Sequence, residues 1–522
     1  MSPFAFAVAF LSLTFVAPAP AADLAATLEK SRAAFGYEAR RAETGLVRFE
    51  GKTRRNGFDG THSLLFARDG RFVHRFEDRL GVTFGFDGRE VWSVDETGLT
   101  RVLDLGDRET ALFATWVATG FWLEPDGPFR IEADPSSSEA GGTALRLALK
   151  DGRTEGTLRL SPETGLPAAL ERVSTSGLDT WRYEDYDRTL GFAFPRRITR
   201  TSGTLTTAIE TASFARAAAP AGDPFAYELA PAPNARFEPG VPPRLDSMRT
   251  RTGHTLVRAA VNGKDVGWFI FDSGAGGMVI DGKAAEAAAM PKFGDVVAVG
   301  IGGPVATSFR QCQKFEVGPL VMTGAPFTEL DLAFLTTAFG VPIGGICGYD
   351  VFGRAVVDFD TAAGTIDLHD PATFDGAGLP FQEVFLMNKV PGIRCRFEGD
   401  REEIFRLDTG AQGSLAFHGP AVKRLSLLEG RETSAGFDGG VGGLTGARKG
   451  RLAWFELGGK RFENLEVSFS LAEKGAFSES ISAGNVGGDI LKSFRLVFDY
   501  PRKRIALLPA APAGAGGEES AR

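Results

Sequence analysis

GWFIFDSGAGGMVI (267–280) is a segment that occurs twice in this chain, because EIFRLDTGAQGSLA (403–416) repeats its pattern. In each copy an apolar run leads into Asp-Ser/Thr-Gly-Ala and then into a second apolar run. A later block, GICGYDVFGRAVVDFDTAAGTIDL (345–368), aligns without gaps with GNVGGDILKSFRLVFDYPRKRIAL (484–507). One D-[ST]-G triplet arises by chance about once per thousand residues, but two copies with matched downstream blocks do not. Residues 248–509 therefore form a duplicated unit, with lobe 1 at 248–375 and lobe 2 at 376–509.

The repeat supplies one aspartate per lobe, Asp272 and Asp408. Two carboxyl groups held face to face cannot both ionise, because like charges repel at short range, so they share one proton. The ionised member can take a proton from water while the protonated member polarises a peptide carbonyl. Each aspartate alone is typical of a turn, whereas the duplicated pair predicts catalysis. The pair titrates as a unit, so the sequence does not say which aspartate carries the proton.

With these motifs the chain resembles the pepsin and retropepsin clan of aspartic proteases, and in particular the bacterial two-lobed retropepsin-like group. The resemblance covers roughly half of the chain. It implies supporting roles for the residues that follow each aspartate, namely Ser273, Gly274, Ala275, Thr409, Gly410 and Ala411. The two hydroxyls would brace the active-site loops against each other, the two glycines would let the backbone turn closely, and the two alanines would keep the floor of the site small.

The same resemblance implies that a strand of the pattern hydrophobic-hydrophobic-Gly passes beside each loop. Ile346-Cys347-Gly348 fits this pattern in lobe 1. Asn485-Val486-Gly487 fits less well in lobe 2, because asparagine is not hydrophobic. Gly348 and Gly487 are the expected inner-strand glycines.

Other features of the two lobes have simpler interpretations. The glycine-rich stretches 297–309 and 436–452 are expected to be hairpins, and by the resemblance they are flaps over the substrate, although neither contains a tyrosine. Asp350 and Asp489 precede apolar helical stretches, which favours helix N-caps. His418 lies close after the second motif, where a lone histidine is more often structural.

The N-terminal part, residues 22–216, has a different pattern. Residues 23–35 and 109–123 favour helices, and from about 45 to 215 alternating apolar residues with Asp-Gly turns predict an antiparallel meander. One helix and a long meander resemble the half-barrel of bacterial lipoprotein-carrier proteins. The Pro-rich segment 217–247 is expected to be a linker that few contacts cross, so that a chain beginning near Asp246 would fold by itself. The expected fold class is mainly β: a two-lobed retropepsin-like acid protease β-fold preceded by an antiparallel β half-barrel-like domain with one or two helices.

Composition and the chain ends narrow the remaining choices. The 522 residues carry a net charge of −8, which leaves no basic footprint for nucleic acid. Five histidines and three cysteines are scattered without H-E-x-x-H or C-x-x-C, so neither a metal site nor a cofactor is expected. Residues 1–21 predict a signal peptide, with an uncleaved membrane anchor as the alternative, and thus an exported protein, periplasmic or secreted. Export permits a disulfide, for which Cys312–Cys347 is the candidate pair, and residues 510–522 are expected to be a disordered tail.

These patterns predict an exported aspartic endopeptidase that acts on a peptide or protein substrate. Because both aspartates lie in one chain, a monomer is expected to hold the complete site. The alternative is a non-catalytic envelope protein that binds lipid or lipoprotein at the N-terminal domain and has degenerate protease-like lobes. The N-terminal domain could also be a prosegment that blocks the cleft, or a domain that recruits substrate.

Overall fold

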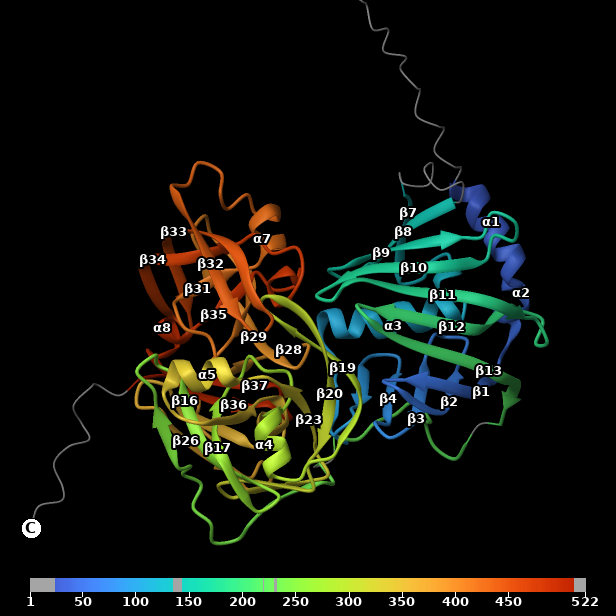
Figure 1. Ribbon diagram of the computed structural model, residues 1–522. Helices are drawn as coiled ribbons and strands as arrows, with labels where there is room; N and C mark the ends of the chain where they lie inside the picture. Colours follow the sequence, from blue (N-terminus) through green and yellow to red (C-terminus); the bar gives the residue numbers. More distant parts are fainter. Residues whose placement is uncertain (1–23, 135–142, 219, 230–231, 511–522) are drawn as a thin grey trace, which may run out of the picture.

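The computed structural model describes residues 24–134, 143–218, 220–229 and 232–510 (Figure 1). The protein is mainly β, as the sequence predicts, with an N-terminal sheet on one side and the two lobes on the other. The expected signal peptide and nearly all of the expected tail lie outside the described residues. Among the described residues, no helix combines the length and the apolar character needed to cross a membrane.

The N-terminal domain is built on one antiparallel sheet. Its strands are β1 Leu46–Arg55, β2 Phe58–Phe66, β3 Phe72–Glu77, β4 Val82–Phe86, β5 Val91–Val94, β6 Thr100–Val102, β7 Phe129–Ala133, β8 Thr143–Leu149, β9 Glu155–Leu160, β10 Pro167–Ser174, β11 Gly177–Asp187, β12 Phe194–Ser202 and β13 Leu205–Ala217. Their order is β6-β5-β4-β3-β2-β1-β13-β12-β11-β10-β9-β8-β7. Because β1 pairs with β13, the sequence neighbours β6 and β7 stand at opposite edges of the sheet.

Four helical segments complete this domain: α1 Leu24–Phe35, α2 Tyr37–Ala42, α3 Leu105–Ala118 and the 3-10 helix η1 Phe121–Leu123. The chain crosses from one edge of the sheet to the other through α3. Phe113, Trp116 and Val117 of α3 are buried against the strands, so the curved sheet wraps around this helix. The helix predicted at 23–35 is α1, and the one predicted at 109–123 begins four residues earlier than expected.

Lobe 1 carries the first copy of the repeat. Its strands are β14 Ala235–Phe237, β15 Ser247–Arg249, β16 Thr255–Val261, β17 Lys264–Phe271, β18 Val279–Asp281, β19 Lys292–Gly300, β20 Gly303–Gln311, β21 Lys314–Val317, β22 Leu320–Thr323, β23 Pro326–Leu330 and β24 Ile343–Cys347, and its helices are α4 Gly282–Ala287, α5 Ala333–Phe339 and α6 Tyr349–Phe352. Strands β17 and β24 run parallel and adjacent. Asp272 follows β17 directly, so it lies where these two strands end.

Lobe 2 carries the second copy with the same local path. Its strands are β28 Phe385–Met387, β29 Val390–Phe397, β30 Arg401–Leu407, β31 Leu415–Phe417, β32 Thr433–Gly440, β33 Gly443–Leu457, β34 Lys460–Ser470 and β35 Gly484–Val486, and its helical segments are α7 Gly419–Arg424, η3 Ala476–Ser478 and α8 Gly488–Leu491. Strands β30 and β35 are also parallel neighbours, and Asp408 follows β30. The repeat in sequence is therefore a repeat in structure.

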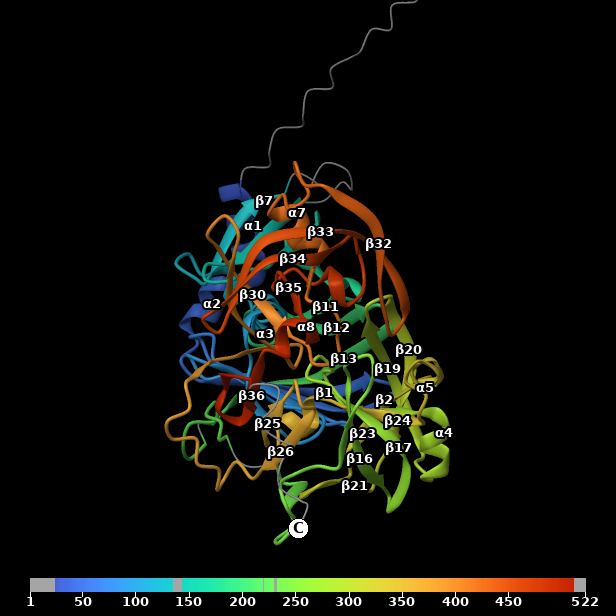
Figure 2. The ribbon, with the colours of Figure 1, turned by 90° about the vertical axis from the view of Figure 1, so that its left-hand side faces the viewer.

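A third sheet joins the lobes. It contains β25 Val356–Asp360, β26 Thr365–His369, β27 Phe381–Glu383, β36 Phe494–Asp499 and β37 Arg504–Pro509, with the 3-10 helix η4 Tyr500–Arg502 between the last two. The order is β26-β25-β36-β37-β27, and β25 of the first copy pairs antiparallel with β36 of the second. The lobes thus share a hydrogen-bonded base, and Figure 2 shows lobe 2 above lobe 1, with β25, β26 and β36 beside lobe 1.

The segment between the N-terminal domain and the lobes is more than a linker. Strand β14, which lies between Pro233 and Pro239, pairs with β22 at the edge of the lobe 1 sheet. Leu99, from the turn between β5 and β6, is buried in the same hydrophobic core as the lobes. Arg354 of lobe 1 donates to the carbonyl oxygen of Thr97 at 2.9 Å. More contacts cross this segment than the sequence suggests, because the five residues between the two prolines, three of which form β14, keep the backbone N–H groups that a strand needs.

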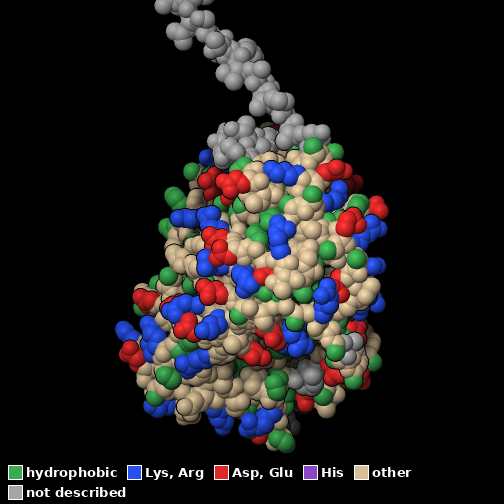
Figure 3. Space-filling model, turned by 90° about the vertical axis from the view of Figure 1, so that its right-hand side faces the viewer, with side chains coloured by type: hydrophobic (Ala, Val, Ile, Leu, Met, Phe, Trp, Pro, Cys, Tyr) green, Lys and Arg blue, Asp and Glu red, His purple; other side chains and the backbone are tan. Residues whose placement is uncertain are grey.

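The outer face of the N-terminal domain carries mixed charge. Figure 3 shows Lys and Arg side chains interspersed with Asp and Glu, and hydrophobic side chains scattered among them. In the interior, Cys312, Cys347 and Cys395 are all buried free thiols. The proposed Cys312–Cys347 disulfide is therefore wrong: each thiol is packed inside the hydrophobic core as a small apolar side chain.

Candidate active site

Each catalytic candidate sits in a tight loop held by the neighbouring inner strand. The backbone N–H of Asp272 donates to the carbonyl oxygen of Cys347, and that of Asp408 donates to Val486, both at 3.0 Å. Within each loop the glycine two residues on donates its N–H to the aspartate, at 2.7 Å in lobe 1 and 3.1 Å in lobe 2. Both carboxyl groups are half-buried. The repeat therefore gives the two aspartates matched orientations.

The two loops face each other so closely that only glycine fits beside each carboxyl group. A Cβ atom on Gly274 would lie 2.4 Å from Oδ1 of Asp408, and a Cβ atom on Gly410 would lie 2.3 Å from Cγ of Asp272. Real contacts of carbon atoms are longer by more than 0.5 Å. Each carboxyl group thus rests against the glycine of the opposite loop, which brings Asp272 and Asp408 together as a pair.

The hydroxyl residues form a reciprocal brace behind the pair. Ser273 Oγ donates to the carbonyl oxygen of Leu407 at 2.8 Å, and Thr409 Oγ1 donates to that of Phe271 at 3.1 Å. In return, each hydroxyl oxygen accepts the N–H of the other residue, at 3.0 and 3.1 Å. Four hydrogen bonds thus cross between the lobes, and both residues are buried, so the loops cannot shift independently.

The remaining small residues fix the loops on the inner strands. The carbonyl oxygen of Ala275 accepts the N–H of Tyr349 at 2.9 Å, and that of Ala411 accepts the N–H of Gly488 at 3.0 Å. A Cβ atom on Gly348 would lie 2.2 Å from the carbonyl oxygen of Gly277, and one on Gly487 would lie 2.7 Å from that of Gly413. The glycines at these two positions let the inner strand pass directly under each loop.

The carboxyl pair is strongly perturbed. Burial and the neighbouring charge of Asp408 raise the pKa of Asp272 to about 8. Burial also raises the pKa of Asp408, but hydrogen bonds from Asn485, Ala411 and Gly410 and the positive charge of Arg406 oppose that rise. Both pKa values are therefore raised, as expected where two carboxyl groups face each other in a buried site.

Asp350 and Asp489 are not helix N-caps, contrary to the sequence prediction. The N-cap positions of α6 and α8 are Gly348 and Gly487, so each aspartate lies inside the first turn. Buried Asp350 accepts the N–H of Met278 at 3.0 Å and is paired with Arg354 at 3.4 Å. It therefore anchors the strand that leaves the active-site loop, whereas Asp489 is exposed and bonds Lys492.

The expected flaps are two long hairpins that meet at their tips. Strands β19–β20 form one hairpin and β32–β33 the other, and the N–H of Gly302 donates to the carbonyl oxygen of Val441 at 3.1 Å between them. Val441 also packs against an apolar cluster of lobe 1 that includes Ala275 of the active-site loop. Both hairpins lie along one edge of the molecule in Figure 2.

The N-terminal domain contacts the first of these hairpins. Asn56, in the turn between β1 and β2, exchanges two hydrogen bonds with the backbone of Asp295, at 2.8 and 3.0 Å. Arg79 stacks on Phe293 at 4.1 Å from the ring centre. The base of this hairpin is thus held by the N-terminal sheet.

The same domain reaches lobe 2 behind the pair. Lys389, in the turn between β28 and β29, lies 2.9 Å from Glu96 and 3.2 Å from Asp95, both in the turn between β5 and β6. Burial would lower the pKa of Lys389, but the two carboxylates raise it above its ordinary value, so the lysine stays charged. In such an ion pair, each charge offsets the cost of burying the other, so removing either partner leaves that cost unopposed.

A polar network behind Asp408 was not predicted. Asn485 donates from Nδ2 to Asp408 Oδ2 at 2.7 Å and accepts at Oδ1 from Nε2 of His418 at 2.9 Å. Ser482 lies 3.2 Å from Nδ1 of His418 and bonds the Glu479 carboxylate at 2.5 Å. The sequence carried two signals: Asn485 breaks the hydrophobic pattern, and Arg406 stands in an apolar strand where the first copy has Ile270.

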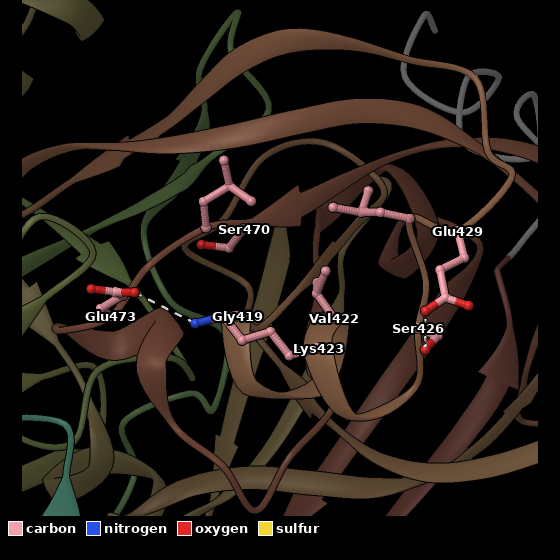
Figure 4. A pocket seen from close by; sticks show the side chains of 9 residues that line it. Gly419, Val422, Lys423, Ser426, Glu429, Ser470 and Glu473 are labelled. Carbon is pink, nitrogen blue, oxygen red and sulfur yellow. Dashed lines mark hydrogen bonds and ion pairs between the residues drawn. The ribbon is translucent and has the colours of Figure 1, made fainter. Parts of the chain in front are cut away.

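A separate pocket lies on lobe 2, with a volume of about 420 Å³ (Figure 4). It is lined by parts of α7, β34 and the loops that follow them, and its charged pair is Lys423 and Glu473 at 3.5 Å. Neither Asp272 nor Asp408 lines it. Among the residues that the structure describes, no group of three or more His, Cys, Asp and Glu side chains is arranged to hold a metal ion.

Comparison with known proteins gives a family match for part of the chain. The aspartyl protease family matches residues 257–351, which run from β16 into α6 and contain the first Asp-Ser-Gly-Ala motif. No curated protein sequence matches the chain significantly. The strand topology, the paired loops and this match together show an aspartic-protease-like fold for the lobes.

Three solved structures show partial likeness. A retropepsin-like aspartic protease from Rickettsia conorii is 17% identical, covering 25% of this chain and 89% of that one, with a TM-score of 0.19. The aspartic proteinase from Irpex lacteus is 14% identical, covering 52% and 98%, with a TM-score of 0.34. A DUF1329 family protein from Desulfovibrio piger is 9% identical, covering 37% and 92%, with a TM-score of 0.26.

Proposed function

We propose that this protein is an exported aspartic endopeptidase that hydrolyses peptide bonds with water activated by Asp272 and Asp408. The observation that carries the proposal is the opposed pair itself: each carboxyl group rests against the glycine of the other loop. This geometry places two titratable oxygens side by side with a shared proton, so one group can act as base and the other as acid.

The two hairpins support an extended peptide as substrate. Hairpins β19–β20 and β32–β33 offer strand edges that could pair with the main chain of a bound peptide. Their tips are joined by the hydrogen bond from Gly302 to Val441, so that contact must open to admit a substrate. Both aspartates come from one chain, and we therefore propose that the monomer is active.

Export is proposed from the pattern of residues 1–21 alone, and sequencing the N-terminus of the mature protein tests it. We also propose that the N-terminal domain stays attached, because Leu99 is buried in the core of the lobes and Lys389 is paired with Asp95 and Glu96. A removable prosegment would leave both contacts unmet. A mature protein of about half the mass of the full chain would contradict this.

The alternative is a lipid- or lipoprotein-binding protein with inactive lobes. The paired loops support catalysis over this alternative, because the brace of Ser273 and Thr409 and both glycines hold two carboxyl groups against each other, an arrangement that a binding protein does not need. On the concave side of the N-terminal sheet, α3 fills the place where a lipid would lie.

Hydrolysis of a denatured protein by the full chain, with and without chelator, tests the proposed function. Asp272→Asn and Asp408→Asn should each lower the rate by about 1,000-fold or more, because one remaining carboxyl group cannot carry out both proton transfers. The melting temperatures of both variants serve as the folding control. Substantial activity in either folded variant, or activity that chelator removes and zinc restores, would refute the proposal.

A further inference from the structure

The two aspartates differ in what stands behind them. In lobe 1, Ile346 of β24 pairs with Ile270 of β17, and both belong to a buried apolar cluster. In lobe 2 the equivalent pair is Asn485 of β35 and Arg406 of β30. The same two backbone positions are thus apolar behind Asp272 and polar behind Asp408.

Asn485 has a fixed orientation. Its amide donates to Asp408 Oδ2 at 2.7 Å, and its oxygen accepts from His418 at 2.9 Å. Because an amide oxygen only accepts hydrogen bonds, this orientation requires the proton of the His418 ring to be on Nε2. His418 is fully buried, and burial lowers its pKa to about 4, so its ring is neutral near pH 7.

The rest of the network holds His418 in place. Glu479 accepts the backbone N–H groups of Ile481 and Ser482, at 2.5 and 2.8 Å, and lies 3.5 Å from Arg406. Burial would raise the pKa of Glu479, but the charge of Arg406 and the hydrogen bonds from Ser482 bring it below its ordinary value. All these side chains are buried, so the network cannot exchange its partners for water.

The hydrogen bonds to the two carboxyl groups are therefore unequal. Asp408 accepts from the side chain of Asn485 in addition to the backbone N–H of Gly410. Among the described residues, no side chain beyond the aspartate pair itself donates to Asp272, which accepts the backbone N–H of Gly274. An additional donor favours the charged form of the group that receives it.

We propose that Asn485, oriented by His418, is a positioning residue that keeps Asp408 as the carboxylate and leaves the shared proton on Asp272. This assignment rests on the proposed endopeptidase function for its catalytic meaning. Asp408 then removes a proton from water as the water oxygen bonds to the carbonyl carbon, and the carbonyl oxygen takes the proton of Asp272. On collapse the C–N bond breaks, Asp408 returns its proton to the leaving nitrogen, and a diol hydroxyl returns one to Asp272.

Other titratable and charged groups also face the pair. Arg406 precedes Asp408 on β30, His254 bonds the carbonyl oxygen of Gly410 at 3.1 Å, and Tyr500 is buried near both aspartates. Burial lowers the pKa of His254 and raises that of Tyr500, which leaves both groups neutral near pH 7. Arg406 therefore adds to the preference for a charged Asp408 and does not compete with Asn485.

Carboxyl carbon NMR of the full chain, labelled with 13C at the aspartate side-chain carboxyl, tests the assignment without any substrate. Asp272→Asn and Asp408→Asn identify the two signals. We expect Asp408 to ionise first, and Asn485→Leu to raise its apparent pKa by about one pH unit, since a hydrogen bond to a charged group is worth about tenfold in the ionisation constant. The matched control is Ile346→Leu, the same side chain at the equivalent position of lobe 1, which should leave the titration of Asp408 unchanged. If Asp272 ionises first, or if Asn485→Leu leaves the apparent pKa of Asp408 unchanged, the proposal is wrong.

Kinetics provide the second readout. Asn485→Leu should lower kcat about 10-fold with little change in KM, and should move the acid limb of the pH–rate profile upward by about one pH unit. His418→Leu should lower kcat, whereas His418→Gln keeps an N–H donor near Asn485 and should retain most of the wild-type kcat. If Asn485→Leu does not fold, the comparison of these two His418 variants takes its place. An equal loss in both His418 variants with an unmoved acid limb would indicate a merely structural role. If the NMR shifts occur but no form of the chain hydrolyses peptides, the proposed function fails while the proton assignment stands.

Discussion

Lobe 1 and lobe 2 hold their aspartates in the same backbone frame but surround them with different chemistry. The loop hydrogen bonds to the inner strand are both 3.0 Å, and the hydroxyl brace is reciprocal. Behind that frame, Ile270 and Ile346 are replaced by Arg406 and Asn485. The backbone geometry is thus matched between the lobes, while the side chains behind it are free to differ.

This difference shows how one proton can be given a place in a nearly symmetric site. If the two lobes were identical, the aspartates would share the proton equally, and either one could act as the base toward water. A donor on one side and an apolar wall on the other remove that degeneracy, at the cost of burying a polar network in lobe 2. Hydrogen bonds extend this network as far as Glu479, whose carboxylate also lies 3.5 Å from Arg406.

The largest effect on stability is expected from removing the N-terminal domain. This deletion tests whether the two lobes fold without it. A chain beginning at Asp246 loses β14 at the edge of lobe 1 and leaves the site of Leu99 empty. In lobe 2 it removes Asp95 and Glu96, the two carboxylates paired with Lys389. Because whole domains are stable by only about 5 to 15 kcal/mol, we expect this chain to be insoluble or to melt at least about 10 °C lower.

Circular dichroism melting of this fragment beside the full chain provides the measurement. Lys389→Met in the fragment is the matched control, since it removes the unpaired charge and should recover part of the loss. A fragment that melts within a few degrees of the full chain would show that the lobes form an independent unit, as the sequence suggested.

Alanine at Gly274 or Gly410 should affect both lobes alike. Each added Cβ atom would push against the carboxyl group of the opposite aspartate, at 2.4 and 2.3 Å. Since displacements of about 1 Å in an active site cost about 100-fold in rate, we expect kcat/KM to fall at least that far in both variants. Gly282→Ala, where the nearest atom is 3.7 Å away, is the control. Near-normal activity in either variant would mean that the glycine it replaces does not lie against the carboxyl group of the opposite aspartate.

A double-mutant cycle on the brace should give smaller and nearly equal costs. Ser273→Ala and Thr409→Val each remove one donor and leave one buried N–H without its acceptor, which destabilises the fold by about 1 to 3 kcal/mol. Because the four hydrogen bonds form one network, the double variant should lose about 1 kcal/mol less than the sum. Urea unfolding measures this. Strictly additive costs would show that the two hydroxyls act separately.

Much of this site can be predicted from the sequence, because both lobes need the same backbone conformation and therefore carry the same residues at matching positions. Close approach requires Gly274 and Gly410, and a loop on an inner strand requires Gly348 and Gly487. Alternation likewise predicts the N-terminal meander, in which a strand such as β9 buries every second residue.

Features that depend on long-range packing could not be predicted. The sequence around Asp350 favours a helix N-cap, but the partner of its carboxylate, the N–H of Met278, lies 72 residues away in sequence. Asn485 departed from the expected pattern, and only the fold brings His418 to it. Leu99 gives no local sign that it packs into a core formed by later residues.

The smallest expected effect is a difference in the pH dependence of stability between Asp272→Asn and Asp408→Asn. An unfolded aspartate has a pKa near 3.9, whereas burial and the neighbouring charge raise the pKa of Asp272 to about 8. Between these values the folded chain holds a proton that the unfolded chain releases, so this stabilisation is complete below about pH 4 and is lost as the pH rises toward 8. Since Asp272 is half-buried, the slope should be no more than about 1 kcal/mol per pH unit. Asp272→Asn should remove that slope. In Asp408→Asn the neighbouring charge is gone, so Asp272 ionises at lower pH and the slope should persist over a narrower range. Urea unfolding of both variants and the wild type from pH 4 to 8 measures the three curves, and parallel curves for the two variants would mean that the proton is not held preferentially on Asp272.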